Sequence, residues 1–189
     1  MTSPPATQPV RARYLGIPFD GTPGQWNAIT DVPGVEVGYR TLIQGDRVRT
    51  GVTAIHPRGA AGAGDPVVAG FFSQNGNGEM TGLSWIEESG TFSGPVGITN
   101  THAVGVVHAG IVAWTIKHYA AGKPDAYDVL RFVPSGALDP FHAAVVQATE
   151  EAVANALAAG EDITGRDGHR SPGLPRAQVA ELFRDRHRA

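Results

Sequence analysis

The sequence predicts a layered α/β or α+β fold, because strand patterns occupy its first half and helix patterns its second half. Val35, Val37 and Tyr39 alternate with Glu36 and Gly38, which is the two-residue period of a half-buried strand. Later in the chain, apolar residues recur every three or four positions, the period of an amphipathic helix. The chain has 189 residues, 41% of them hydrophobic and 17% charged, a balance typical of a globular domain.

Three further short segments of the first half have strand character, at 52–55, 67–72 and 95–99. The segment 67–72 is continuously apolar, as expected for a strand that is covered on both faces. Asn75-Gly76 is a tight-turn signal, so the segment 80–86 could return as the partner strand.

The second half contains three helix patterns. The first has apolar residues at helical spacing from Val104 to Ile116, with Gly122 and Pro124 as its stop, and is apolar nearly all round, which favours burial between layers. The second begins at Asp139-Pro140 and ends at Gly160, and the third begins at about Arg176. The residues expected on the buried face of the second helix are Phe141, Val145, Ala148, Ala152 and Ala156, and those expected away from it are Gln147, Glu150 and Glu151. The residues expected on the buried stripe of the third are Val179, Leu182 and Phe183.

The expected domain organisation is simple. Residues 1–13 are predicted to be a disordered lead-in, because their prolines prevent regular structure. Residues 14–189 are predicted to form a single domain. That domain has a join between an N-terminal part, 14–130, and a C-terminal helical part, 137–189.

Composition excludes several classes of function. A net charge of −3 gives no electrostatic case for binding nucleic acid or an anionic membrane. The chain has no cysteine, which excludes disulfides, thiolate catalysis and cysteine-based metal sites. No pair of histidines has the i,i+4 spacing of a zinc site, so no metal and no cofactor is expected. The N-terminus lacks an apolar signal region and no apolar run is long enough to span a bilayer, so a cytoplasmic location is expected.

Several long motifs follow one another along the chain. They cover 27–35, 49–54, 75–82, 85–90, 94–105, 148–152 and 164–168. The most specific are the run from Asn75 to Gly82 and the run from Gly94 to Gly105. In content and order these motifs resemble the DmpA-type L-aminopeptidase/D-esterases, or β-peptidyl aminopeptidases, a family of self-processing serine aminopeptidases.

The resemblance implies a fold and a reaction. The fold would be a layered α/β/β/α sandwich similar to that of N-terminal-nucleophile hydrolases. The precursor of such an enzyme cuts itself at a Gly-Ser bond, and the freed serine uses its own α-amino group as general base. The substrates would be small peptides, amides or esters with a free N-terminal amine.

The chain departs from the family pattern between Leu130 and Ala137. There the family has a long segment that holds the nucleophile and the residues that assist it, and this chain contains no Gly-Ser dipeptide. We therefore expect an incomplete fold without central strands, and we assign no catalytic residue. Because lost strands would leave apolar faces uncovered, the chain is expected to be soluble only as a homo-oligomer or to be partly molten.

Six residues are candidates for lining a pocket: Asn75, Asn77, Glu79, Asn100, Thr101 and His102. The alternative for the first three is a tight turn whose asparagines bond the local backbone. The alternative for the last three is a helix N-terminus capped by Asn100 or Thr101.

Three functional hypotheses remain open at this point. The chain could derive from an active aminopeptidase, be a non-catalytic truncated paralogue, or be a binding module that kept a pocket of the same fold. Gly90-Thr91 is the nearest substitute for a self-cleaving bond, since threonine can also act as an N-terminal nucleophile.

Overall fold

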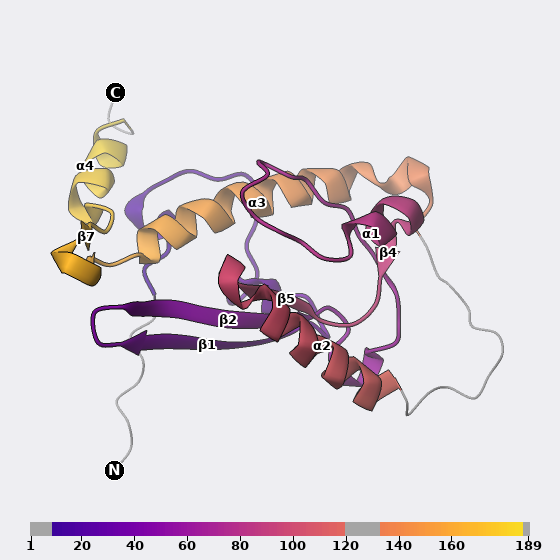
Figure 1. The fold of residues 1–189 in the computed structure, drawn as a ribbon. Helices are drawn as coiled ribbons and strands as arrows, with labels where there is room; N and C mark the ends of the chain where they lie inside the picture. The colour runs from indigo at the N-terminus through magenta and orange to yellow at the C-terminus, as the bar shows by residue number, and fades with distance from the viewer. Residues whose placement is uncertain (1–8, 120–132, 187–189) are drawn as a thin grey trace, which may run out of the picture. The chain divides into compact units, whose positions relative to one another are not determined.

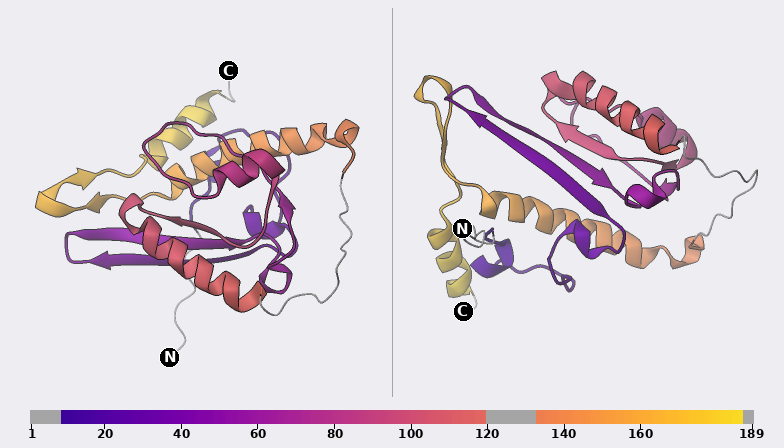
Figure 2. Two further views of the ribbon diagram at one scale, coloured as in Figure 1. Left: turned by 45° about the vertical axis from the view of Figure 1, so that its right-hand side comes forward. Right: turned by 90° about the horizontal axis from the view of Figure 1, so that it is seen from below.

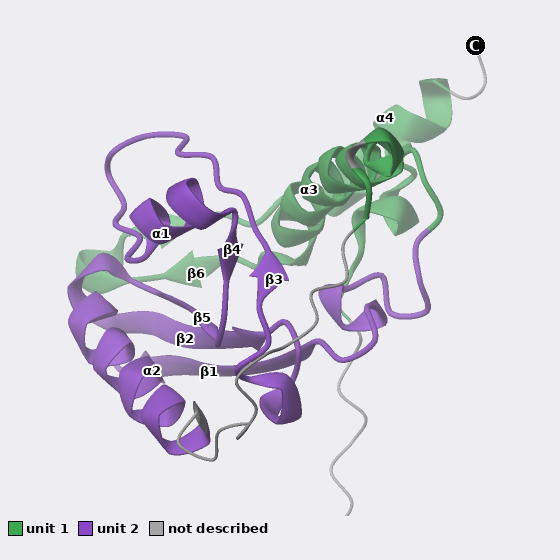
Figure 3. Cartoon of the chain, turned by 90° about the vertical axis from the view of Figure 1, so that its right-hand side faces the viewer, with its two compact units in different colours: residues 1–22, 129–189 green, residues 23–128 purple. Residues whose placement is uncertain are grey.

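The structure is a computed structural model that describes residues 9–119 and 133–186. The chain divides into two compact units, one made of residues 1–22 and 129–189 and the other of residues 23–128 (Figures 1 and 3). Both units mix helices with short sheets, in agreement with the predicted α/β class. Within the described ranges, every helix is too short or too polar to cross a bilayer.

The unit of residues 23–128 is built on a three-stranded antiparallel sheet. Strands β1 (Glu36–Gln44) and β2 (Val48–His56) form a long hairpin, and β5 (Val96–Thr99) pairs with the other edge of β2. The strands predicted near Val37, at 52–55 and at 95–99 are therefore confirmed.

Helix α2 (Val104–Tyr119) covers one face of this sheet (Figure 2). A Cβ atom added to Gly97 of β5 would lie 2.6 Å from the Ile111 side chain and 2.8 Å from that of Val107. The glycine thus lets the helix approach the sheet closely. The helix begins at Val104 as predicted, and its predicted stop at Gly122 and Pro124 lies outside the described residues. Its predicted burial between layers is wrong, because Val106 and Ile116 are 77% and 64% exposed.

The predicted buried strand at 67–72 is wrong. Strand β3 contains only Val67–Val68 and pairs with β4 (Thr91–Phe92). Val68 is 85% exposed and Phe72 90% exposed, so this apolar run has no layer over it within its unit. The strand suggested at 80–86 is also wrong, because helix α1 (Leu83–Ser89) occupies most of that segment.

The other unit packs a short N-terminal segment against helices. It contains a 3-10 helix at Ala12–Leu15, helix α3 (Asp139–Ala159), a small hairpin of β6 (Ile163–Thr164) and β7 (Arg170–Ser171), and helix α4 (Arg176–Arg186). Its buried core consists of Ala12, Leu15 and Ala158. Ala12 and Arg13, which the sequence suggested as part of the lead-in, thus belong to this unit.

Helix α3 begins and ends where it was predicted, but its predicted orientation is wrong. Phe141 and Val145 are 54% and 65% exposed, whereas Glu151 and Asn155 are buried. The two polar side chains are buried because each bonds the N-terminal segment. In α4, Val179 packs against the core as predicted, but Leu182 is exposed.

Candidate functional site

The first three predicted pocket residues lie in the long loop between β3 and α1. The backbone N–H of Asn77 donates to Asn75 Oδ1 at 2.9 Å, and Ser73 Oγ donates to the carbonyl of Asn75 at 3.1 Å. This is the local turn that the sequence offered as the alternative. Asn75, Asn77 and Glu79 are all exposed.

Asn100 caps the N-terminus of the helical segment that leads into α2. Its Oδ1 accepts hydrogen bonds from the backbone N–H groups of His102, at 3.0 Å, and of Ala103, at 3.2 Å. Its Nδ2 donates to Thr50 Oγ1 on β2. The capping alternative therefore describes Asn100 correctly, and both ends of its amide are engaged.

Thr101 and His102 follow the cap and are exposed. Across the described residues, no hydrogen bond or ion pair joins these two residues or Asn100 to the loop that carries Asn75, Asn77 and Glu79. The six candidates thus form two separate groups, each of which organises its own backbone.

Two other family-like motifs also build turns. In the segment 27–35, the carboxylate of Asp31 accepts from the backbone N–H groups of Trp26, at 2.9 Å, and Ala28, at 3.1 Å. In the segment 164–168, Asp167 and Gly168 have φ angles of 60° and 73°, which allow the β6–β7 hairpin to close. A positive φ is uncommon for aspartate, so this turn is a specific feature of the sequence.

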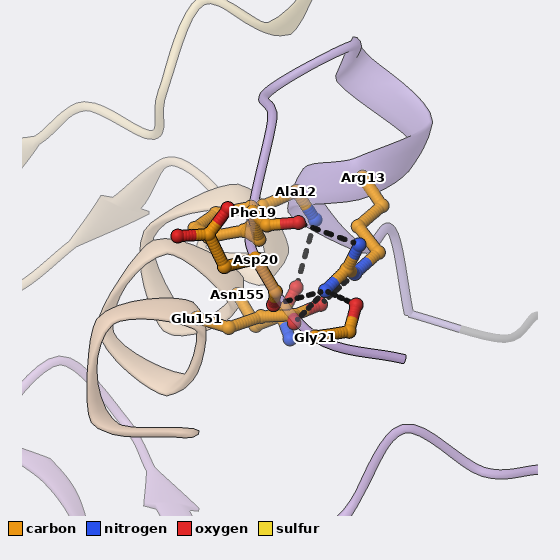
Figure 4. Close-up of polar contacts among 7 residues, drawn as sticks. All are labelled: Ala12, Arg13, Phe19, Asp20, Gly21, Glu151 and Asn155. Atoms are coloured by element: carbon orange, nitrogen blue, oxygen red, sulfur yellow. Dashed lines mark hydrogen bonds and ion pairs between the residues drawn. The ribbon is translucent and has the colours of Figure 1, made fainter. Parts of the chain in front are cut away.

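The most heavily bonded polar cluster was not predicted (Figure 4). Arg13 Nε and Nη2 donate to the two carboxylate oxygens of Glu151, each at 2.7 Å. The same guanidinium donates to the carbonyls of Phe19, Asp20 and Gly21. The hydrogen bonds that Arg13 donates to Glu151 raise the pKa of Arg13 above its usual value. These bonds engage both carboxylate oxygens and all three guanidinium nitrogens, which indicates an anchor for the N-terminal segment.

A second unpredicted cluster lies where β2 meets α2. The rings of Trp114 and His118 stack with centroids 3.9 Å apart, and the ring of His56 lies 4.3 Å from Trp114. His118 Nδ1 lies 2.7 Å from the carbonyl oxygen of Trp114. The i,i+4 spacing of Trp114 and His118 is the one sequence signal that could have indicated this contact.

Hollows in the described parts of the chain are lined by other residues. One includes His56, Arg58 and Asp65, and another includes Asp162 and Arg176. None of the six predicted pocket residues contributes to these two hollows. Within the described ranges, no group of three histidine or acidic side chains could hold a metal ion.

Comparison with known proteins adds the family. The model of peptidase family S58 matches residues 27–130 and, separately, residues 118–171. The chain belongs to peptidase family S58. Its motif at 27–35, the turn at Asn75, the cap at Asn100 and the helix α3 all lie inside the matched residues, so the resemblance to self-processing aminopeptidases is confirmed.

One curated relative is the β-peptidyl aminopeptidase BapA of Sphingosinicella microcystinivorans, which is 56% identical over 112 residues. That match spans 55% of this chain but only 28% of the relative, so most of the relative has no counterpart in the alignment. Among solved structures, the L-aminopeptidase D-Ala-esterase/amidase of Ochrobactrum anthropi is 43% identical with a TM-score of 0.55, covering 76% of this chain and 43% of that one.

These neighbours establish the fold class. The Ochrobactrum anthropi enzyme is described as a variant of the Ntn hydrolase fold, and the α/β sandwich expected here is of that kind. The partial coverage of that enzyme is consistent with an incomplete fold. The PH0078 protein of Pyrococcus horikoshii OT3 has the same fold at 18% identity, with a TM-score of 0.81 over 95% of this chain and all of that one.

Proposed function

We propose that this chain derives from a serine aminopeptidase of small peptides, amides or esters and has lost the segment that carries the nucleophile. It would therefore bind a substrate with a free N-terminal amine without hydrolysing it. The proposal rests on the relation between this family and this sequence, in which the Gly-Ser bond needed to free a catalytic serine is absent.

One observation supports the proposed deletion. The family model matches the chain in two stretches that overlap at 118–130, rather than in one continuous alignment. Such a double match is expected where two distant parts of the family sequence have been joined. We place the join between the part 14–130 and the part 137–189 of a single domain; residues 120–132 lie outside the described residues.

The proposed amine site draws on both groups, the loop of Asn75, Asn77 and Glu79 and the group around Asn100, although no hydrogen bond of the described residues joins them. Glu79 is the one carboxylate among the six candidates, so it would pair with the ammonium group of the ligand. Thr101 and His102, which follow the cap residue, are exposed. They would supply a hydroxyl and an imidazole to the ligand. The partners are thus small peptides or amides.

A second candidate function is that of a truncated paralogue that binds nothing at these residues. The hydrogen bonds already described favour this candidate. The side-chain oxygens of Asn75 and Asn100 already accept from backbone N–H groups rather than from a ligand. For either candidate we propose a cytoplasmic homo-oligomer that does not bind nucleic acid, since a net charge of −3 gives no electrostatic basis for attracting a polyanion.

Titration of the purified chain with alanyl-alanine amide, followed by ligand-observed NMR, separates the two candidates. Binding of the free amine but not of its N-acetyl derivative is expected if the amine site exists. The variant E79Q should lose that binding, whereas the matched variant E87Q on the neighbouring helix α1 should keep it. Equal signals for the free and the acetylated ligand would favour the truncated paralogue.

A further inference from the structure

Strand β1 has an unusual combination of length and exposure. It runs for nine residues, Glu36–Gln44, and every one of them is exposed. Within the described residues its partner is β2 alone, so its other edge presents unpaired backbone groups. The strand contains no proline, no lysine and no break in its register, and Glu36 and Arg40 are the charged residues along this edge.

The register also shows which side chains lie on which face of the sheet. Gly97 of β5 faces α2. It pairs with Ala54 of β2, which pairs in turn with Gly38 of β1. Residues paired directly across strands lie on the same face of a sheet, so Gly38 also lies on the face toward α2. The alternate residues of β1 therefore lie on the opposite face. Among them Tyr39 is 79% exposed and Ile43 is 63% exposed. The free edge is thus flanked by a row of exposed apolar side chains.

We propose that β1 is the homo-oligomer contact, in which the β1 strands of two copies pair antiparallel across a two-fold axis and join their sheets. This inference rests on the homo-oligomer of the proposed function and assigns the surface that forms it. A two-fold contact uses the same strand from both copies, so it needs a sequence that is complementary to itself.

Two centres of the pairing can be compared. A centre at Arg40 places the guanidinium groups of both copies directly opposite each other, which is unfavourable. A centre at Thr41 places Thr41 opposite its own copy and Tyr39 opposite Ile43 of the second copy, twice. Threonine pairs and aromatic pairs with β-branched residues are favourable neighbours across strands. The self-complementary register is therefore the one centred on Thr41.

This register also spares the part of β1 that already has a role. It pairs residues 38–44 of each copy and leaves Glu36 outside, where its carboxylate accepts from the backbone N–H of Ala60 at 3.2 Å. Seven paired residues supply about six interstrand hydrogen bonds, because opposite residues alternate between bonded and non-bonded pairs. The contact combines these bonds with the apolar row on the face away from α2.

The absence of cysteine from the chain makes the register directly testable. In the pairing centred on Thr41, the Cα atoms of the two copies at that position lie about 4.5–5.5 Å apart, within the range of a disulfide. The variant T41C should therefore migrate at twice the monomer mass under mild oxidation and return to the monomer on reduction. The full-length chain without substitution should show the dimer mass by light scattering.

The matched controls lie on the same face of the same strand. In Y39C the two cysteines are four residues out of register, roughly 13 Å apart along the strand, so this variant should not cross-link. The double variant Y39C/I43C should cross-link, because each cysteine then faces its counterpart. The variant T41K should give a monomer with an unchanged far-UV circular dichroism spectrum, since an edge lysine opposes strand pairing.

Each outcome decides the inference. If the chain is a dimer but T41C cross-links no better than Y39C, the β1 contact is overturned. The proposed homo-oligomer would then form through another surface. A chain that is monomeric by light scattering overturns both. Neither result bears on the binding of a peptide amine, so failure of the amine site remains distinguishable from failure of the β1 contact.

Discussion

The guanidinium of Arg13 donates two hydrogen bonds of 2.7 Å to the carboxylate of Glu151, although 138 positions separate the two residues in the sequence. One residue further toward the N-terminus, the backbone N–H of Ala12 donates to Asn155 Oδ1 at 2.8 Å. Asn155 lies one helical turn beyond Glu151 on α3, so two adjacent residues of the N-terminal segment are tied to two adjacent turns of the helix. The geometry explains why this face of α3 is polar and yet buried.

Removing the carboxylate should destabilise the unit that contains α3. The variant E151Q loses the charge and one of the two acceptors, so the melting temperature should fall by several degrees. The neighbouring variant E150Q, on an exposed position of the same helix, should leave it unchanged. An unchanged melting temperature for E151Q would show that the ion pair adds nothing to stability. The variant R13K gives a second check, because lysine cannot make the two-pronged contact.

The β6 hairpin should respond to acid through Asp162. The backbone N–H of Gly173, at 2.7 Å, and the guanidinium of Arg170 lower the pKa of this carboxyl below its usual value. Its stabilising contribution is therefore complete above the unfolded pKa of about 3.9 and is lost as the pH falls through the lower folded value. The variant D162N should flatten the dependence of melting temperature on pH below about pH 4. The variant E161Q should retain the wild-type curve in the same titration.

The cap at Asn100 should be a measurable source of stability. The variant N100A removes the acceptor of two backbone N–H groups and should cost about 1 kcal/mol in free energy of unfolding. The variant N100D keeps the accepting oxygen and should recover most of that loss. Denaturant titrations of both, with T101A as the control, measure these differences. A loss in T101A as large as that in N100A would mean that Thr101, not Asn100, is the cap.

The contact between α2 and the sheet should be sensitive to a single methyl group at Gly97. The added carbon of G97A would lie 2.6 Å from the Ile111 side chain and 2.8 Å from that of Val107, so these side chains must repack, at a cost of about 1–3 kcal/mol. The matched variant G38A lies on the same face of the sheet, in β1, with no atom within 4 Å of the added carbon. Urea denaturation should therefore separate the two variants, and equal midpoints would contradict the close packing of α2 on β5.

Local patterns were sufficient for the elements whose signals are local. The alternation around Val37 predicts β1, and the cap and apolar spacing after Asn100 predict α2. Asp139-Pro140 and Gly160 predict the ends of α3. In each case the capping or alternating residues lie within the element or beside it, so tertiary contacts are not needed to locate it.

The buried face of α3 could not be predicted in the same way. Apolar periodicity favours the face of Phe141 and Val145, but the buried face is set by Arg13, which lies far away in the sequence. A buried carboxylate is recognisable only once its cation is known, since an unpaired charge would not be buried. The same holds for His56, whose ring contact with Trp114 joins β2 to α2.

The prediction of a buried strand at 67–72 is wrong for a different reason. Its apolar run is typical of a strand between two layers, yet Val68 and Phe72 are exposed and only two residues are paired. We propose that the layer expected over this segment belongs to the part of the family sequence that this chain lacks, since the neighbouring enzyme, of which this chain covers 43%, is a larger protein.

Hydrolysis of an alanine aryl amide by the purified 189-residue chain, with its intact mass recorded alongside, tests the central proposal most directly. We predict no turnover and a single uncut mass, because the chain contains no Gly-Ser bond from which an N-terminal serine could be freed. Turnover accompanied by two fragments would contradict the proposal. The fragment masses would then identify the nucleophile, and the first bond to check is Gly90-Thr91, where Ser89 Oγ lies 3.2 Å from Thr91 Oγ1.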